Sequence, residues 1–252
     1  MALRIDVLTL FPRMFDGVFS ESLLGKATQR GLVDLRVLDI RGFSTDKHHT
    51  ADDRSYGGGP GMVLKAEPLL GALKAVGAGT PLRGPGSRKN QRRPFVIYLS
   101  PQGRPFSQSL ADTLVKKKRL VLIAGHYEGI DERIFDWVDS EVSVGEAVLT
   151  GGEIPAMAVV DAVVRKVPGV VKETDSLKWD SFAPGWEGQL DCPHFTRPAE
   201  WRGRRVPDVL LEGNHKKIQA WRSAASQSAT RKKRPDLIQT LTTRRGRGTV
   251  KK

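Results

Sequence analysis

The residues of this sequence that could do chemistry lie in a few short stretches. The run Val144–Pro155 joins an apolar triplet to a glycine pair, Gly151 and Gly152, and then to a proline. Glycine lacks Cβ, so its backbone can approach a ligand closely, and proline suits the first turn of a helix. A strand end, a glycine turn and a helix start meet there, which predicts a ligand site in an α/β protein; a plain connecting turn is the alternative.

Two charged residues beyond that run have candidate roles. Asp180 lies between aromatic residues in Trp179–Phe182, and an apolar setting favours a carboxylate that acts as a general base. The same residue can instead cap a turn through Ser181. Arg165 follows Asp161 by four residues, so these two side chains can also form an ion pair on one helix.

We predict no metal site. The polar stretch Arg41–Arg54 holds the adjacent histidines His48 and His49 together with aspartates, but it lacks the spacing of a metal ligand set. Cys192 is the only cysteine, and next to His194 it is interpreted as a small packed residue rather than a nucleophile. A single cysteine excludes an intramolecular disulfide, which fits a reducing compartment.

The charge of the chain favours a polyanionic partner. Its 252 residues carry a net charge of +13, with a pI of about 10.1. A basic tail on an ordinary enzyme is the alternative, yet the basic clusters are spread over Arg83–Arg93, Lys116–Arg119, Arg202–Arg205 and the end of the chain. Such a distribution indicates nucleic acid. The arginine-rich insertion over residues 80–93 fits RNA contact and a solvated loop equally well.

The elements that must position these groups alternate between strands and helices. Three strand-like runs end in turn residues, at Ser100, Gly125 and Gly151, and the carboxyl ends of parallel strands form the ligand edge of an open α/β sheet. Neither a GxGxxG nor a GxxxxGK[ST] motif is present. The predicted strands are Leu3–Leu10, Leu32–Ile40, Phe95–Ser100, Leu120–Gly125 and Val142–Leu149; the predicted helices are Met14–Arg30 (irregular at Gly25), Lys65–Val76, Ser107–Lys118 and Ala156–Lys166; Ser55–Val63 is predicted to be a loop.

The composition predicts two domains and a soluble protein. Residues 1–171 are expected to form the α/β domain, 172–188 a mobile interdomain linker, and 189–252 a small, mainly helical domain with a basic tail. No apolar run approaches the roughly 20 residues that span a membrane. The N-terminal residues lack the pattern of a signal peptide, so we expect a cytoplasmic protein.

Eight segments, in order along nearly the whole chain, carry a specific set of motifs. They are Ile5–Pro12, Asp53–Met62, Tyr98–Gly103, Gly125–Arg133, Leu149–Met157, Asp180–Phe182, Leu190–Pro198 and Arg234–Leu237. Together they resemble the bacterial tRNA (guanine-N1)-methyltransferases of the TrmD type. The resemblance implies an S-adenosylmethionine-dependent enzyme of the SPOUT class, with an α/β domain that holds a deep trefoil knot. It also implies a homodimer with shared active sites, which methylates N1 of guanosine 37 of tRNA, 3′ of the anticodon.

The resemblance also assigns roles to individual residues. Asp180 matches the general base and Arg165 the residue that orients the guanine. The family requires Mg²⁺, for which this sequence shows no ligand set, and it usually carries glutamine and arginine where this chain has Ala225 and Ala229. The basic insertion 80–93 is also longer than in the family. The residues that match the cofactor site are Tyr98, Leu99, Ser100, Pro101, Gly125, Tyr127, Glu128, Val144, Gly145, Glu146, Ala147, Val148, Leu149, Gly151, Gly152 and Pro155.

Two other functions stay open at this point. One is a SPOUT methyltransferase that acts on a different nucleotide, against which the Asp180–Phe182 segment argues. The other is a catalytically silent RNA-binding protein that keeps the fold, which the intact glycine run and Asp180 disfavour.

Overall fold

The computed structural model describes residues 2–83 and 93–238, and the chain divides into two compact units, Met1–Lys172 and Glu173–Lys252. The first unit contains β1 (Leu3–Thr9), the 3-10 helix η1 (Pro12–Phe15), α1 (Asp16–Ser20), α2 (Ser22–Gln29), β2 (Val33–Asp39), η2 (Ile40–Phe43), β3 (Asp52–Asp53), β4 (Val63–Leu64), α3 (Ala66–Ala75), β5 (Phe95–Pro105), α4 (Gln108–Leu114), β6 (Arg119–Ala124), η3 (Glu132–Trp137), β7 (Ser140–Ser143) and α5 (Glu153–Val164).

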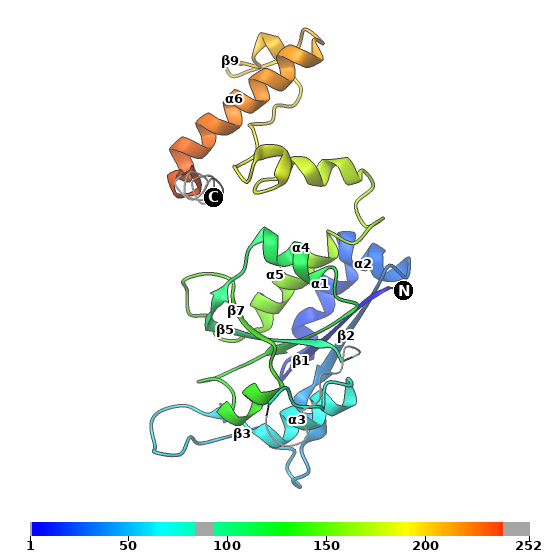
Figure 1. The fold of residues 1–252 in the computed structure, drawn as a ribbon, viewed down its shortest axis with the longest axis vertical. Coiled ribbons are helices and arrows are strands. Elements are labelled where there is room, and N and C mark those ends of the chain that lie inside the picture. Colours follow the sequence, from blue (N-terminus) through cyan, green and yellow to red (C-terminus); the bar gives the residue numbers. More distant parts are fainter. Residues whose placement is uncertain (1, 84–92, 239–252) are drawn as a thin grey trace, which may run out of the picture. The chain divides into compact units, whose positions relative to one another are not determined.

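The first unit is built on a parallel five-stranded sheet in the order β2-β1-β6-β5-β7. Helices α1, α2, α4 and α5 lie on one side of the sheet and α3 on the other (Figure 1). The central strand β6 is buried along nearly its whole length, as expected for a parallel strand covered on both faces. This arrangement confirms the predicted α/β class with a parallel sheet.

Alternating side chains of β1 feed two separate cores. Ile5 and Val7 pack with α2, α4 and α5, whereas Leu8 packs with α3. Because successive side chains of a strand point to opposite faces, one apolar strand can serve both layers. The sheet is therefore held rigidly from two sides, which fixes the positions of its strand ends.

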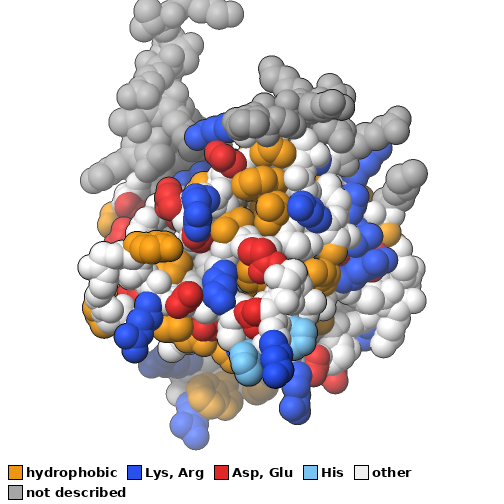
Figure 2. Space-filling view, turned by 90° about the horizontal axis from the view of Figure 1, so that it is seen from below, with side chains coloured by type: hydrophobic (Ala, Val, Ile, Leu, Met, Phe, Trp, Pro, Cys, Tyr) orange, Lys and Arg blue, Asp and Glu red, His pale blue; other side chains and the backbone are white. Residues whose placement is uncertain are grey.

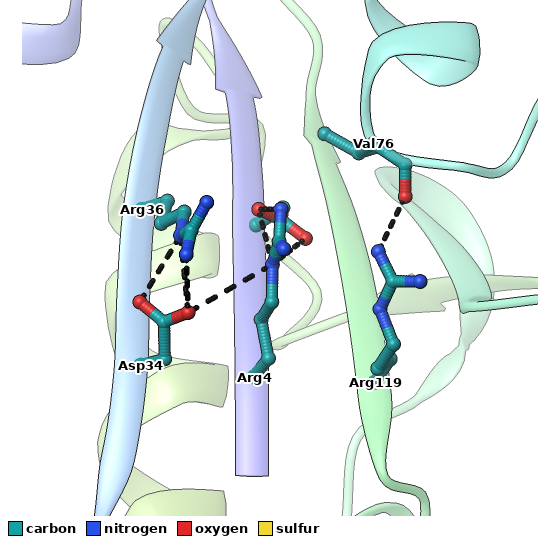
Figure 3. A network of polar contacts seen from close by, with 6 residues as sticks. Arg4, Asp34, Arg36, Val76 and Arg119 are labelled. Atoms are coloured by element: carbon teal, nitrogen blue, oxygen red, sulfur yellow. Dashed lines mark hydrogen bonds and ion pairs between the residues drawn. The ribbon is translucent and has the colours of Figure 1, made fainter. Parts of the chain in front are cut away.

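Charged side chains of β1, β2 and β6 form ion pairs and hydrogen bonds in the first unit (Figure 3). The Asp6 carboxylate is fully buried and forms an ion pair with Arg4 at 2.8 Å. On β2, Asp34 pairs with Arg36 at 2.8 Å, and on β6 the Arg119 guanidinium donates to the Val76 carbonyl at 2.7 Å. A buried carboxylate that lost its partner would be strongly destabilising, so the Arg4–Asp6 pair makes this charge tolerable in the core.

The predicted helix over Met14–Arg30 is in fact broken in two. The break falls at Glu21 and Ser22, where Ser22 has a φ of +51°, and not at Gly25. Gly25 lies inside α2, and an added Cβ there would lie 2.0 Å from the Ser20 carbonyl oxygen, so the turn between α1 and α2 requires glycine.

Strand β5 continues past its predicted end at Ser100. It pairs with β7 through Leu99, shifts register, and pairs again through Arg104 and Pro105. The shift brings Gly103 against β7, where a Cβ would lie 2.3 Å from the Val142 backbone nitrogen. The following helix α4 begins as predicted, with the Ser107 hydroxyl accepting from Leu110 N, but it ends at Leu114 instead of Lys118.

The second unit combines short 3-10 helices, a small hairpin and one long helix. Its elements are η4 (Thr174–Trp179), η5 (Pro184–Trp186), β8 (Glu200–Trp201), β9 (Arg204–Arg205), η6 (Asp208–Leu210) and α6 (His215–Lys233). The stretch predicted to be a mobile linker contains η4 and η5, and its mobility stays a prediction. Among the described helices of both units, none has the length and apolarity that crossing a membrane requires.

Replacing Gly103 with alanine is expected to lower the free energy of unfolding by about 1–3 kcal/mol, because the new methyl group would overpack the β5–β7 contact. Urea titration followed by circular dichroism measures the change. Gly42→Ala is the matched control, since a Cβ at Gly42 meets nothing within 4 Å. Equal urea midpoints for the two variants would show that β7 yields freely at this point.

Candidate functional site

A cavity of about 320 Å³ opens beside the carboxyl ends of β6 and β7 and the part of β5 where its register with β7 shifts. The strands are parallel, and the register pairs Leu99 with both Ala124 and Val142. The residues that follow these three, Ser100, Gly125 and Ser143, therefore lie at the same edge of the sheet, where open α/β sheets bind ligands. All three line the cavity.

The cavity gathers nearly all the residues that the sequence assigns to a cofactor. Glu146 is the exception, because it is exposed and does not line the cavity. The lining residues that the prediction missed lie within about seven positions of a predicted one in the sequence. Including more of the residues that flank each motif would have found them. The predicted lining residues are Tyr98, Leu99, Ser100, Pro101, Gly125, Tyr127, Glu128, Val144, Gly145, Ala147, Val148, Leu149, Gly151, Gly152 and Pro155; the missed ones are Gln102, His126, Gly129, Ile130, Glu132, Phe135, Glu141, Val142 and Ser143.

The prediction of a strand over Val142–Leu149 is wrong, because β7 ends at Ser143. The Ser143 hydroxyl donates to the Gly145 carbonyl at 2.8 Å and accepts from Gly145 N at 3.3 Å, which turns the chain out of the sheet. Apolar side chains follow in a loop, and Val148 is 86% exposed. Exposed apolar side chains that line a cavity are suited to contact a ligand.

Two backbones approach closely at the floor of the cavity. Gly152 N donates to the Gly125 carbonyl at 2.6 Å. A Cβ at Gly152 would lie 2.8 Å from Ala124 Cα, and one at Gly151 would lie 2.4 Å from His126 Nδ1. The glycine pair is required here because only a chain without Cβ can pass this close to the end of β6.

The buried carboxylate of Glu153 contacts the end of β1 and the residue after β6 and Gly125. Glu153, the first residue of α5, is 1% exposed and accepts a hydrogen bond from the Thr9 hydroxyl at 2.7 Å. His126 Nδ1 lies 3.6 Å from Glu153 Oε2, and its ring packs against Phe11 with centroids 4.7 Å apart. The end of β1, the residue after Gly125 and the start of α5 therefore share one contact. A carboxylate in the first turn is also favoured by the helix dipole.

Tyr98 supplies a neutral phenol to the cavity. Burial, with a contribution from the Glu141 and Glu132 carboxylates, raises the pKa of the Tyr98 phenol to about 12. The group therefore keeps its proton at neutral pH and can donate a hydrogen bond. Its ring lies where a Cβ at Gly125 would be, 2.8 Å from Cε2, so this glycine leaves room for it.

The glycine-rich loop predicted at Ser55–Val63 reaches the cavity from the other side. Glu128 N donates to the Met62 carbonyl at 3.0 Å. Gly61 has a φ of +84°, and a Cβ there would lie 2.5 Å from Glu128 Oε1. The loop therefore packs against Glu128, which lines the cavity. Tyr56 of the same loop is fully exposed.

A wider groove of about 1290 Å³ is lined by this loop, α3 and η3. Figure 2 views the molecule from the end where α3 lies in Figure 1, and on that face Lys and Arg are interspersed with Asp and Glu. The positive excess of the chain is therefore not gathered into one basic surface on this face.

The two predicted catalytic residues do not line the cavity. Arg165 is the C-cap of α5, and its backbone N–H donates to the Asp161 carbonyl at 3.0 Å. Asp180 belongs to the second unit, where its carbonyl accepts from Ala183 N at 3.0 Å. The Ser181 hydroxyl accepts from Asp191 N at 2.9 Å. The catalytic roles of Arg165 and Asp180 stay predictions.

No metal site is predicted from the sequence, and one group of potential metal ligands occurs among the described residues; it does not include His48 or His49. The ligand atoms of Asp191, Cys192 and His194 lie within 4.8 Å of one another. Asp191 already accepts from Cys192 N at 2.6 Å and pairs with His194 Nε2 at 2.8 Å, and burial raises the pKa of the Cys192 thiol. A protonated thiol and an imidazole do not suit Mg²⁺, which prefers oxygen ligands.

Comparisons with known proteins identify the same family over nearly the whole chain. Residues 3–240 match the family described as tRNA (Guanine-1)-methyltransferase TrmD. A protein of Endomicrobium trichonymphae named tRNA (guanine-N(1)-)-methyltransferase is 50% identical over 94% of this chain and 99% of its own length. Proteins of the same name from Pelotomaculum thermopropionicum and Geobacillus kaustophilus are each 49% identical over 94% of this chain, and over 90% and 91% of their own lengths.

Replacing Thr9 with valine is expected to lower the free energy of unfolding by about 1–3 kcal/mol, because the buried Glu153 carboxylate loses its hydroxyl donor. Thr9→Ser, which keeps the hydroxyl, should recover part of the loss. Thr113→Val is the control, since Thr113 is exposed and its hydroxyl bonds only within α4. A Thr9→Val protein that unfolds at the wild-type urea concentration would contradict this role of Thr9.

Proposed function

Because the chain belongs to the TrmD family of tRNA (guanine-1)-methyltransferases, we propose that it transfers a methyl group from S-adenosylmethionine to N1 of guanosine 37 of tRNA, 3′ of the anticodon. The observation that best supports the proposal is the cavity beside β5, β6 and β7. Almost every residue that the sequence assigns to the cofactor lines this cavity. A tRNA-modifying enzyme works where tRNA is found, so we place it in the cytoplasm.

The cavity fits S-adenosylmethionine in shape and charge. Because Gly125, Gly151 and Gly152 lack Cβ, the Tyr98 ring, His126 and the end of β6 pack closely around the cavity. The loop over 144–149 supplies an apolar wall. Glu128 and other carboxylates in the lining suit the positive charge of a sulfonium. When bound, S-adenosylmethionine supplies an electrophilic methyl group on that sulfonium. The residues of the cavity hold and orient it, because in-line displacement depends on alignment.

The path of the chain around the cavity is proposed to form a deep trefoil knot. Two contacts support it: the Gly152–Gly125 hydrogen bond and the bridge between His126 and Gly151. They bring the segment between β7 and α5 against the end of β6, which precedes it by more than 20 residues. Such threading is rare in proteins, and a glycine-rich crossing would allow it.

Asp180 and Arg165 are proposed to perform the chemistry on the guanine. N1 of guanine carries a proton, so a carboxylate such as Asp180 must accept it as the methyl group arrives. Negative charge then builds toward O6, where the Arg165 guanidinium can stabilise it and hold the purine edge. The target base has to leave its stack to be reached, as in other enzymes that act on bases.

We propose a homodimer in which each site is completed by the partner chain. Asp180 belongs to a different compact unit from the cavity and does not line it, which is compatible with a role in the site of a second copy. Residues 189–252 are proposed to bind tRNA, with the positive charge of this segment facing the phosphates. Ala225 and Ala229 are half-buried on α6, so larger polar residues there would gain only partial exposure.

The specificity is tested with tRNA transcripts that differ only at position 37. We expect tritium from methyl-labelled S-adenosylmethionine in the transcript with guanosine 37 and none in the one with adenosine 37, because adenine N1 carries no proton and its 6-position is an amine. Equal labelling of both transcripts, or labelling elsewhere in the tRNA, would contradict the proposal and favour a methyltransferase that acts on another nucleotide.

The roles of Asp180 and Arg165 are tested by removing their charges. Asp180→Asn is expected to lower the single-turnover rate constant by about 10²–10⁴-fold, the range for general acid–base catalysis. Arg165→Gln should lower it by about 10²–10³-fold, as for a lost oxyanion donor. Calorimetry should show S-adenosylmethionine binding nearly unchanged in both variants, because neither residue lines the cavity.

Matched controls separate this effect from a general loss of charge. Asp16→Asn removes an exposed carboxylate of α1, and Arg36→Gln an exposed guanidinium of β2. Both should turn over at the wild-type rate. Wild-type single turnover in Asp180→Asn or Arg165→Gln would remove that residue from its proposed role.

A further inference from the structure

A second cavity, of about 420 Å³, lies wholly within the second unit. It is set between α6 and the segment Pro193–Arg197, and nothing described so far uses it. We infer that this cavity receives an unstacked nucleobase of the tRNA, from a nucleotide other than the methylated guanosine. The inference rests on the proposed function, and it adds a specific contact to what is otherwise a general basic surface.

Two aromatic rings form the walls of the cavity. Phe195 and Trp221 have ring centroids 6.1 Å apart and are tilted by 57°. Half of the Phe195 side chain is exposed, so a flat face of an apolar ring is open to a ligand. Nucleobases stack on such faces regardless of their sequence, and RNA-binding proteins commonly capture unstacked loop bases in this way. The volume is within the range of small-ligand pockets.

Cations surround these rings. Arg197 and Arg222 line the cavity, and in the part of the chain that the structure describes neither forms an ion pair with a carboxylate. His194 also lines it and is oriented by its contact with Asp191 at 2.8 Å. An aromatic slot with unpaired guanidinium groups at its edge suits a nucleotide, which offers a base to the rings and a phosphate to the cations.

The hairpin β8–β9 extends the positive charge beyond the cavity. Arg202 stacks over the Trp201 ring with its guanidinium carbon 4.8 Å from the centroid, and Trp201 is 60% exposed. Arg204 is also exposed. A backbone that leaves the cavity on this side would therefore meet further cations and a second exposed ring.

Hydrogen bonds join α6 to Leu190, which precedes the wall segment Pro193–Arg197 in the chain. The Ser226 hydroxyl of α6 donates to the Leu190 carbonyl at 2.6 Å, and Leu190 N donates to the Thr230 hydroxyl at 3.1 Å. Ser226 and Thr230 are both buried. The segment that carries Phe195 is thus fastened to the helix that carries Trp221, which reduces the entropy lost when a base enters.

Charge favours RNA over a second copy of the chain as the occupant. Another copy would bring the same net charge of +13, whereas tRNA brings one negative charge per nucleotide. Within the described residues of the second unit, 173–238, 12 Lys and Arg outnumber 9 Asp and Glu, so this part of the chain carries a small positive excess.

The test combines Phe195→Ala with a scan of abasic sites through the anticodon loop of the tRNA. Phe195→Ala is expected to weaken tRNA binding by roughly 5- to 100-fold, the range for a lost base–aromatic stack. Phe195→Tyr keeps the ring and should bind as the wild type does. Met14→Ala removes a comparably exposed apolar side chain from the first unit and serves as the matched control.

One abasic position should weaken wild-type binding by a similar factor and should cost nothing further in Phe195→Ala. A 5-iodouridine at that position should crosslink to Phe195 or Trp221 in the wild-type protein, a result that does not depend on how the variant folds. If every abasic site costs the same in wild type and variant, and the crosslink falls elsewhere, the inference is wrong.

The remaining outcomes are distinguishable. A Phe195→Ala protein that shifts the monomer–dimer equilibrium in sedimentation, with unchanged tRNA affinity, would overturn the inference in favour of a second copy as occupant. A wild-type protein that binds tRNA but transfers no methyl group to guanosine 37 would contradict the proposed function instead, while the coupling between Phe195 and the abasic position would still decide the cavity.

Discussion

The first unit depends on the contact between two backbones at Gly125 and Gly152. The hydrogen bond of 2.6 Å between them is possible because Gly152 carries no Cβ, which would lie 2.8 Å from Ala124 Cα. It sets the start of α5 against the end of β6, which buries the Glu153 carboxylate beside Thr9 and His126. Since a buried carboxylate is costly without partners, each of these groups constrains the others. The cavity is the space left around this fixed point.

In the proposed function, the residues that bind the cofactor differ from the residues that act on the guanine. Most of the residues that line the cavity are glycines and apolar side chains, which are suited to hold a cofactor, and the titratable side chains of the lining include His126 and Glu128. The candidate base and the candidate guanidinium lie outside it, at Asp180 and Arg165. A rigid binding floor can therefore stay constant while the reacting groups are delivered from other parts of the chain.

Much of the fold follows from local patterns. The strands predicted at Leu3–Leu10 and Leu120–Gly125 are parallel strands over Leu3–Thr9 and Arg119–Ala124. Strand β6 is almost wholly apolar because it is covered on both faces. The loop at Ser55–Val63 also follows from its glycines. The predicted strand ends are wrong where a hydrogen bond or a distant part of the backbone overrides the local pattern. The hydrogen bond of Ser143 ends β7 early. The close contact of Gly103 with the Val142 backbone accompanies the extension of β5 beyond Ser100.

The periodicity of the sequence predicts the α/β class, because it is a local property of each stretch, and the resemblance of the ordered motifs to a known family assigns most of the cavity residues. Only the tertiary structure decided which of these residues meet. Thr9 and Glu153 are 144 positions apart, and nothing near either one indicates the other. The cavity at Phe195 and Trp221 likewise exists because the fold brings two distant segments together. Such contacts arise from the path of the chain, which no short stretch of sequence encodes.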